Sequence, residues 1–261
     1  MVILDSVTIS IVTHNSKHIF HVLNQIKTEL AASSVGVMVF DNASAPAYQN
    51  QLKAYQSDQI QITLASVNKG FGFGHNYNLA RIKTTYFICC NPDILLKKAD
   101  FTLMLHQLQA RPEISMVTPK IVDPKGETQY LIRRRLDVFD YLLRFVPFGF
   151  VKRLFAKRLA HYECRDLSNQ TQLIKYGSGA FMFLRAQAMR EIGGFDERFF
   201  MYFEDNDLCD RLRQAGGKIC YVPAARVVHY YARDSHKHFS VFIIFLKSMT
   251  KYFNKWGWQF F

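Results

Sequence analysis

Residues 7–44 read VTISIVTHNSKHIFHVLNQIKTELAASSVGVMVFDNAS, and this stretch decides the fold class. It opens on a β-branched run at Val7–Thr13 and ends just after a second run at Val35–Phe40, while Lys17–Ala32 carries apolar residues at helical spacing. Two further runs of β-branched and aromatic residues follow at Ile60–Leu64 and Tyr86–Cys90. The alternation predicts an α/β protein with a Rossmann-like, mainly parallel sheet flanked by helices, which binds ligands at the carboxyl ends of its strands.

The composition indicates one large globular domain with an acidic partner. The chain has 261 residues, of which 49% are hydrophobic and 21% charged, so it can bury a core. Its 33 Lys and Arg exceed its 21 Asp and Glu by 12 charges. Such an excess favours nucleic acid, an anionic membrane surface or a phosphorylated ligand, and composition does not choose among them.

Cysteines and hydropathy indicate a cytoplasmic protein that does not span a membrane. The five cysteines are odd in number and form no CxxC pair, and Met1–Asp5 leads straight into a strand-like segment rather than a secretory leader. The longest wholly apolar run near either end is Val241–Leu246, whereas a membrane-spanning helix needs about 20 residues.

Two basic segments stand apart from the α/β pattern. The first, an amphipathic insertion at about 131–165, holds eight basic and two acidic residues within 131–160. Helices at about 185–192 and 206–215 and a strand at Ile219–Val222 follow it. The second segment is the tail 236–261, where lysines share one helical face opposite an aromatic face. The tail fits a helix lying on a membrane, or a helix packed on the domain.

Three polar motifs follow predicted strands. Asp41 ends the second strand, where a carboxylate binds ribose hydroxyls, and an Asx turn or helix cap explains it equally well. The glycines of Asn68–Asn76 alternate before a helix, which suits a phosphate or a tight turn. Asp93, in Asn91-Pro92-Asp93, is placed to bind a hard divalent cation or to cap a helix.

Two further motifs lie near the end of the domain. Glu204-Asp205 follows the aromatic run Phe199–Phe203, and an apolar wall raises the proton affinity of a carboxylate, which suits a general base. His229 lies just beyond the last predicted strand, where a neutral imidazole completes a metal shell or serves only structure.

Seven motifs, taken in chain order, resemble family 2 glycosyltransferases, and most closely the bacterial rhamnosyltransferase-like branch that builds O-antigen and other surface polysaccharides. The likeness runs from about residue 7 to about residue 229. The motifs are SIVTHN at 10–15, VFDNAS at 39–44, NKGFG at 68–72, NPD at 91–93, GSGAFM at 177–182, GGFDE at 193–197 and FFMYFEDNDLCDRLR at 199–213.

The resemblance implies a single GT-A domain at 1–235, with a nucleotide-sugar half at about 1–115 and an acceptor half at about 116–235. Implied catalytic residues are Asp205, as the base, and Glu204. A divalent ion, Mg²⁺ or Mn²⁺, is implied at Asp93 and His229, although Asn91 replaces the first Asp of the family's DxD motif. The remaining residues implied to bind the nucleotide sugar are Thr13, Asn15, Asp41, Asn68, Gly70, Phe71 and Asn91.

The resemblance also implies the reaction. An acceptor hydroxyl deprotonated by Asp205 attacks the anomeric carbon from the face opposite the diphosphate, so one displacement inverts the configuration. The donor favoured by resemblance is dTDP-L-rhamnose, ahead of UDP-linked hexoses or galactofuranose. A lipid-linked saccharide acceptor places the protein peripherally on the inner face of the cell membrane, where the anionic leaflet attracts basic segments.

Two other functions fit parts of the sequence. A non-catalytic sugar-nucleotide-binding scaffold would need the same fold, but the chain retains Asp41, Asp93, Asp205 and His229 together. A nucleic-acid-binding protein would use the basic segment at 131–160, but the acidic residues at 196–210 would repel a phosphate backbone.

Overall fold

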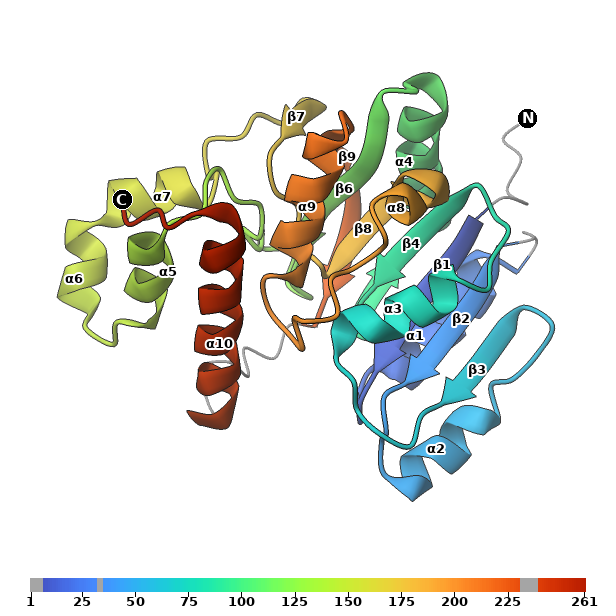
Figure 1. Ribbon diagram of the computed structural model, residues 1–261. Coiled ribbons are helices and arrows are strands. Elements are labelled where there is room, and N and C mark those ends of the chain that lie inside the picture. Colours follow the sequence, from blue (N-terminus) through green and yellow to red (C-terminus); the bar gives the residue numbers. More distant parts are fainter. Residues whose placement is uncertain (1–6, 32–34, 231–238) are drawn as a thin grey trace.

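The computed structural model describes residues 7–31, 35–230 and 239–261, and it shows a central sheet between two layers of helices (Figure 1). The strands are β1 Val7–Thr13, β2 Gly36–Asp41, β3 Ile60–Leu64, β4 Tyr86–Cys90, β5 Ile94–Leu96, β6 Ile114–Val122, β7 Gln172–Ile174, β8 Phe181–Arg185 and β9 Lys218–His229. The helices are α1 Ile19–Glu29, α2 Pro46–Lys53, α3 Phe71–Leu79, α4 Lys98–Ala110, α5 Val138–Phe145, α6 Gly149–Leu154, α7 Ala156–Tyr162, α8 Ala186–Glu191, α9 Glu204–Gln214 and α10 Phe239–Trp256.

The sheet has the order β3-β2-β1-β4-β8-β6-β9-β5, with β7 paired to β9. Strands β1 to β4 are mutually parallel, and β6 is parallel to β9, which confirms the α/β fold class. The antiparallel strand β8 is inserted between β4 and β6. The order 3-2-1-4 means that the connections leave β1 in opposite directions, and this opens a crevice at the carboxyl ends of β1 and β4.

Alternation along β1 builds a different core on each face of the sheet. Val7, Ile9 and Ile11 are fully buried and pack with α1 and α4. On the other face, Ser10 Oγ lies 2.8 Å from His75 Nδ1 and accepts a hydrogen bond of 2.9 Å from Asn78 Nδ2. Burial lowers the pKa of His75 to about 3, so this imidazole is neutral and serves to fix α3 on the sheet.

The last strand is longer than the sequence predicts. Proline has no N–H to donate and so argued for a strand end at Val222, but β9 continues through Pro223 to His229. The β6–β9 register shifts between Pro119 and Lys120, so residues 223–225 bulge out without breaking the ladder. His229 therefore ends the strand itself, opposite Ile94 of β5, rather than lying beyond it.

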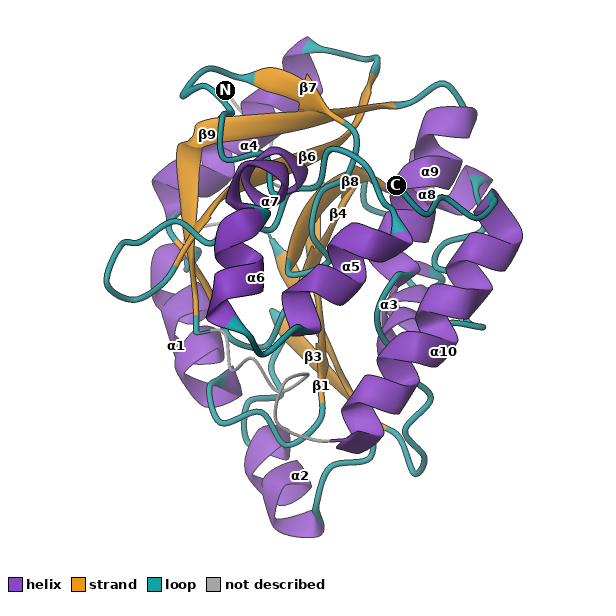
Figure 2. Cartoon of the chain, turned by 90° about the vertical axis from the view of Figure 1, so that its left-hand side faces the viewer, coloured by secondary structure: helices purple, strands orange, loops and turns teal. Residues whose placement is uncertain are grey.

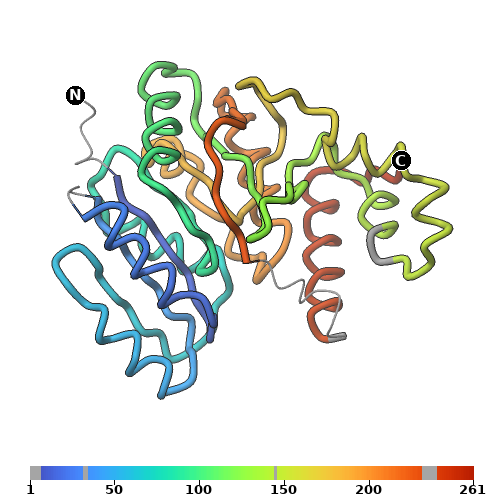
Figure 3. The backbone as a smooth tube through the Cα atoms, turned by 180° about the vertical axis from the view of Figure 1, so that it is seen from behind, coloured from blue at the N-terminus to red at the C-terminus, as the bar shows by residue number. Residues whose placement is uncertain are grey.

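The basic insertion forms a lobe of three short helices, α5 to α7, at the side of the molecule away from β3 (Figures 1 and 3). Its charges are not all surface charges. Arg133 is buried, Arg134 pairs with Asp166, and Arg135 pairs with Asp137. Three consecutive arginines thus have three different environments.

Helix α10 packs on the domain, with its aromatic face turned inward. Four of its side chains, Phe245, Met249, Tyr252 and Phe253, are buried. Its Lys255 binds the buried carboxylate of Asp207 in α9 at 2.6 Å. The packed alternative therefore describes this helix, while Lys237 and the predicted boundary after residue 235 lie outside the described residues. Within the described ranges, no helix has the length and apolar character that crossing a bilayer requires.

The two tryptophans provide a matched test of this packing. Trp256 Nε1 donates a hydrogen bond of 2.9 Å to Asp207, whereas Trp258 bonds Asn254 in an exposed position. Because a hydrogen bond to a charged group contributes about 1.5–3 kcal/mol, we expect Trp256→Phe to lower the free energy of unfolding by that amount. Trp258→Phe should change it by less than about 0.5 kcal/mol. Urea unfolding measures both, and equal effects would contradict this placement of α10.

Candidate active site

The polar residues expected at the strand ends lie along one edge of the sheet. Thr13 and Asp41 are paired at the ends of β1 and β2, and β1 separates β2 from β4, after which Asn91 follows. Since neighbouring strands lie about 4.8 Å apart, the ends of β2 and β4 are about 10 Å apart. Ser16, after β1, reaches the loop after β4 by a hydrogen bond of 3.5 Å to Pro92 O.

Asp41 makes the turn that the sequence allows with one carboxylate oxygen and leaves the other oxygen without a described partner. It is fully buried, and its Oδ2 accepts hydrogen bonds from Ser44 N at 3.0 Å and from Gln49 Nε2 at 2.7 Å. This oxygen makes the turn. Its Oδ1 has no hydrogen-bond partner among the described residues. An unpartnered buried oxygen is costly, so Asp41 is prepared to accept a hydrogen bond from a ligand.

Thr13 and Asn15, at and just after the end of β1, hold the residues that follow β2 by hydrogen bonds. The Thr13 hydroxyl is bonded to Tyr48, and burial raises the pKa of that tyrosine to about 12. Asn15 donates its N–H to Ser44 Oγ at 2.8 Å and accepts from Ala45 N at 2.9 Å. Both residues hold the loop after β2 in place, and their contact with a nucleotide sugar stays a prediction.

The glycine-rich loop serves packing rather than a phosphate cradle. Gly70 has φ +93°, and a Cβ there would lie 2.4 Å from the Phe200 carbonyl oxygen. Its N–H donates to Asn68 Oδ1 at 3.0 Å, and the N–H of Phe71 donates to Phe200 O at 3.0 Å. Because protein acceptors occupy both amides, the phosphate expectation for these amides is corrected. The loop instead joins the nucleotide-sugar half to the segment before α9.

Asp93 and His229 form a pair with the character of metal ligands. Asp93 Oδ1 lies 3.4 Å from His229 Nε2 and makes no hydrogen bond within the described part of the chain. His229 Nδ1 lies 2.8 Å from Gln129 Oε1, and Gln129 Nε2 donates to His229 O at 2.9 Å. An amide oxygen only accepts, so Nδ1 carries a proton, and Nε2 is the ring nitrogen that faces Asp93.

This pair fits a divalent cation whose shell the substrate completes. Adjacent ligands of octahedral Mg²⁺, each at about 2.1 Å, lie about 3 Å apart, close to the separation of these two acceptors. Among the residues that the structure describes, no cluster of three or more His, Cys, Asp or Glu side chains could hold a metal. Two protein ligands are enough where substrate phosphates and water supply the others.

The Glu204-Asp205 pair begins α9 beside this edge. Asp205 Oδ2 accepts a hydrogen bond of 2.9 Å from Gly179 N, and the next residue, Ala180, accepts one of 3.0 Å from Asn91 N. One dipeptide, Gly179-Ala180, therefore contacts both the acidic pair and the loop that carries Asp93. The structure thus links Asp205, through one dipeptide, to the loop that carries Asp93, which pairs with His229, while Asp41 lies two strands away.

Burial raises the pKa of both carboxyl groups, as expected from the aromatic run Phe199–Phe203 that precedes them. The pKa of Glu204 is held well above 4.5 by its own burial and then by the negative charge of Asp205. The pKa of Asp205 is raised by burial, but the N–H groups of Gly179 and Asn206 and the charge of Arg133 oppose the rise. Of the two, Asp205 is the better stabilised carboxylate.

The backbone before the pair is strained. Tyr202 and Phe203 have φ values of +72° and +66°, in the left-handed region that bulky residues avoid at a cost of about 1–3 kcal/mol each. Phe203 is held by its buried ring, whose centroid lies 4.5 Å from that of Tyr141 and 5.4 Å from that of Phe245. Helices α5 and α10 therefore fix the residues that present Glu204 and Asp205.

Sequence reasoning missed two residues of this site. Gln129 sets the His229 tautomer from 100 positions away, and no spacing rule signals it. Arg133 lines a cavity of about 140 Å³ with Glu204 and Asp205, held by hydrogen bonds to Tyr130 O and Ile132 O. Its sequence signal is its place in an Arg-Arg-Arg run of the basic insertion, and the run does not show which of the three arginines is buried.

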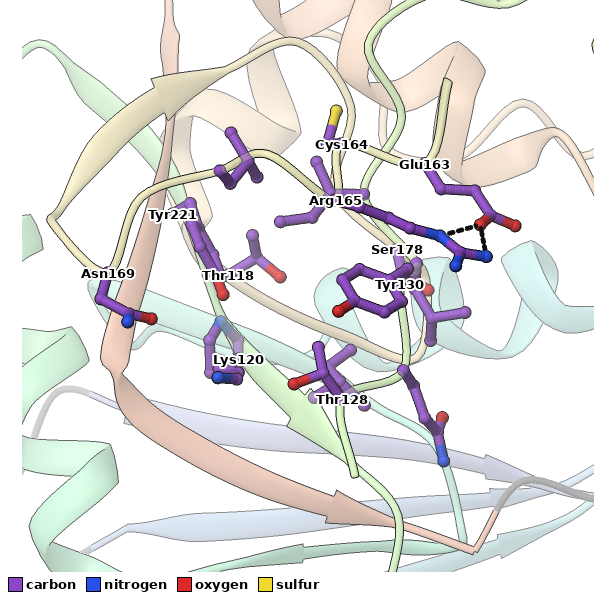
Figure 4. Close-up of a pocket in the computed structure, with 16 residues that line it drawn as sticks. Thr118, Lys120, Thr128, Tyr130, Glu163, Cys164, Arg165, Asn169, Ser178 and Tyr221 are labelled. Carbon is purple, nitrogen blue, oxygen red and sulfur yellow. Dashed lines mark hydrogen bonds and ion pairs between the residues drawn. The ribbon is translucent and has the colours of Figure 1, made fainter. Parts of the chain in front are cut away.

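Two more cavities continue from the Asp205 cavity. The second, of about 190 Å³, shares Leu131 and Ser178 with it, and polar groups from several segments surround the space (Figure 4). The third, of about 880 Å³, shares Tyr130, Arg165 and other residues with the second. It extends to α6 and α7 and also shares Leu131 and Arg133 with the Asp205 cavity, so the three cavities adjoin one another around Leu131 and reach the helical lobe.

Comparison with known sequences gives one family and several named relatives. The family model described as "Glycosyltransferase like family 2" matches residues 4–244. The rhamnosyltransferase WbbL of Escherichia coli K12 is 30% identical over 193 residues, covering 70% of each chain. The N-acetylglucosaminyl-diphospho-decaprenol L-rhamnosyltransferase of Mycobacterium tuberculosis is 27% identical over 212 residues, covering 77% of this chain and 68% of the relative.

Comparison with solved structures identifies the fold. GalNAc-T7, solved with UDP, GalNAc and Mn²⁺, superposes with a TM-score of 0.70 at 14% identity, over 95% of this chain and 47% of that one. The mannosyltransferase PcManGT of Pyrobaculum calidifontis, solved with GDP-Man and Mn²⁺, gives 0.65 at 15% identity, over 96% and 63%. The chain thus spans about half to two thirds of these structures, and its mixed α/β fold matches GT-A glycosyltransferases.

Proposed function

The chain belongs to the family 2 glycosyltransferases, and from this premise we propose that it transfers L-rhamnose from dTDP-L-rhamnose to a hydroxyl of a lipid-linked saccharide, with inversion. The observation that carries the transferase chemistry is the contact of Gly179-Ala180 with both Asp205 and the loop before Asp93. This contact supports the proposal of a general base near a metal-binding pair, which is the arrangement that attack on an activated sugar requires.

The donor occupies the edge formed by β1, β2 and β4. Asp41 Oδ1, buried and without a described partner, accepts a hydrogen bond from the nucleoside. Asp93 and His229 would hold a divalent ion, Mg²⁺ or Mn²⁺, and Gln129 fixes the imidazole. When bound, that ion neutralises charge on the leaving diphosphate.

Asp205 takes the proton of the acceptor hydroxyl. Two adjacent buried carboxyl groups do not ionise together, so one proton is retained by the pair. Gly179 N, Asn206 N and the charge of Arg133 favour the carboxylate at Asp205, whereas Glu204 Oε2 has no hydrogen-bond partner in the described chain. Glu204 therefore keeps the proton, and Asp205 is the base. A single displacement from the face opposite the diphosphate inverts the anomeric carbon.

The relatives support the choice of donor and acceptor. Both named relatives are rhamnosyltransferases, and the name of the mycobacterial one gives a lipid diphosphate carrying N-acetylglucosamine as its acceptor. The adjoining cavities beside Asp205 provide room for an acceptor within residues 116–235, the half of the chain where we expect the acceptor to bind. We place the reaction in surface polysaccharide assembly, of the O-antigen type, at the inner face of the cell membrane.

A donor panel tests the proposal. The purified chain is incubated with a GlcNAc-diphospho-lipid and dTDP-L-rhamnose, UDP-glucose, UDP-galactose or UDP-galactofuranose, with Mg²⁺, Mn²⁺ or EDTA, and release of the nucleoside diphosphate is followed. We expect acceptor-dependent release from dTDP-L-rhamnose with metal only, and a product linkage whose anomeric configuration is opposite to that of the donor. Equal release from a UDP-hexose would contradict the assignment of dTDP-L-rhamnose as the donor. Unchanged release in EDTA would contradict the dependence on a metal ion.

A further inference from the structure

The helical lobe carries large apolar side chains that face solvent. Phe148, Phe150 and Leu154 are 60%, 73% and 78% exposed, and we call these three residues the α6 tip. The rings of Phe148 and Phe150 lie 5.9 Å apart, and Phe150 and Leu154 are four residues apart on one helix, which puts them on the same face. Exposed apolar side chains that gather in this way mark a surface that contacts a partner.

The charge around the α6 tip has one sign. Residues 141–162 hold five Lys or Arg and no Asp or Glu. Arg158 is committed to Asp140 at 2.6 Å, but Arg153 and Lys157 are exposed on α6 and α7. The surface around the α6 tip therefore combines apolar side chains with long cationic ones. The charged ends of such side chains reach water while their stems lie on apolar surface.

We propose that the α6 tip is a docking surface for an anionic lipid bilayer. Charged residues are depleted from the cores of protein interfaces, whereas aromatic and aliphatic side chains beside Lys and Arg are typical of segments that lie in the headgroup region. Charge complementarity with anionic lipids favours the same partner. Helix α6 has six residues and so inserts only side chains.

The position of the α6 tip gives docking a consequence for catalysis. The 880 Å³ cavity is lined by residues of α6 and α7, namely Lys152, Arg153, Ala156 and Leu159. This cavity adjoins the cavity that contains Asp205. Because Arg153 of α6 lines the 880 Å³ cavity, docking through the tip brings that cavity close to the lipid headgroups (Figure 2 shows α7 at one end of α6). This step rests on the proposed function, because it assumes a lipid-linked acceptor whose diphosphate lies at that depth.

The same argument excludes the aromatic face of α10 as the docking surface. Phe245, Met249, Tyr252 and Phe253 are at most 6% exposed because they pack on the domain. Using them on a membrane would uncover the core beside Phe203. The surface that binds lipid is therefore on the insertion rather than on the inward face of the C-terminal helix.

Flotation of the full chain with vesicles tests the proposal. The vesicles are phosphatidylcholine alone or phosphatidylcholine with phosphatidylglycerol. We expect the wild-type chain to bind the anionic vesicles. The double variant Phe150→Ser/Leu154→Ser should lower the binding affinity by about tenfold or more. The double variant Arg153→Gln/Lys157→Gln should lower it less, and at high salt its affinity should equal that of the wild type. The control Leu103→Ser/Leu173→Ser removes exposed apolar side chains elsewhere and should bind within about twofold of wild type.

The outcomes separate this proposal from the proposed function. Wild-type flotation that is absent, or that both serine double variants reduce equally, would overturn the α6 tip as a lipid surface. Self-association that the Phe150→Ser/Leu154→Ser variant abolishes, without flotation, would assign the tip to a protein partner instead. Binding of dTDP by titration calorimetry should be equal in all variants. A wild-type chain that floats but transfers no sugar would count against the function and leave the surface intact.

Discussion

Asp205→Asn is expected to lower the rate of sugar transfer by about 10²–10⁴-fold, the usual contribution of a positioned general base. The amide cannot take the proton of the acceptor hydroxyl, but its oxygen can still accept the hydrogen bond from Gly179 N. The local structure and the donor site are therefore retained. Initial rates of nucleoside diphosphate release give the loss, and calorimetric binding of dTDP should be unchanged.

Glu204→Gln is the matched control for that variant. Glutamine resembles a protonated glutamate, so a residue that only holds the proton tolerates this change, and we expect turnover within about tenfold of wild type. If Glu204→Gln inactivates the enzyme and Asp205→Asn does not, the two roles are reversed. Equal and complete loss in both would instead show that the pair acts as one unit.

The raised pKa values of the pair fix the sign of its pH dependence. The base must be ionised, so activity should fall as pH decreases through a value above the ordinary 3.8 of Asp205. For stability, a carboxyl group with a raised folded-state pKa stabilises the fold below its unfolded pKa, and this contribution is lost as pH rises through the folded pKa. Glu204→Gln avoids that loss, so its gain in melting temperature should grow with pH. A gain that is constant with pH would contradict the buried ionisation.

Asp93→Asn should reduce metal-dependent transfer by at least about 100-fold. The variant removes the charge of one of two protein ligands, so the cation loses its strongest protein partner next to the diphosphate. Titration of activity with Mn²⁺ measures the effect, and added metal should restore only part of the rate. Unchanged metal dependence would show that the cation does not bind between Asp93 and His229.

Gln129→Leu tests the same site from a residue that does not itself bind the metal. Without the amide oxygen, Nδ1 of His229 is no longer held as the protonated nitrogen, and such outer contacts typically affect metal affinity by 10–100-fold. We expect a weaker apparent affinity for Mn²⁺ with the maximal rate largely recovered at saturation. A lowered maximal rate with unchanged affinity would place Gln129 in the reaction rather than behind the histidine.

The first four strands were predictable because each is a short local pattern. Val7–Thr13, Ile60–Leu64 and Tyr86–Cys90 have the bounds that their β-branched and aromatic runs indicate. Once those strands are parallel, Asp41 and Asp93 must lie at one edge of the sheet, because the carboxyl ends of parallel strands meet there. The short strand β8 escaped prediction, because an apolar run between glycines does not reveal its antiparallel partners.

Other features depended on neighbours that the local sequence does not specify. The alternating glycines near residue 70 fitted a phosphate loop, but Gly70 approaches the backbone of Phe200, 130 positions later. Likewise, the aromatic face of α10 is compatible with membrane binding on its pattern alone. In the structure it packs on Phe203, and Lys255 of the same helix pairs with Asp207 of α9. Hydrophobic periodicity says that a face is buried without naming what buries it.

The sequence by itself determined the α/β alternation, the acids at the strand ends and the likeness to family 2 glycosyltransferases. Only the tertiary structure decided that Asp93 meets His229, that Gln129 sets the histidine, that Arg133 turns inward beside Asp205, and that the exposed apolar surface is on α6 rather than α10. The reason is physical: local patterns fix φ and ψ preferences and which face is apolar. The charge and pKa of a site depend instead on the side chains that long-range packing places around it.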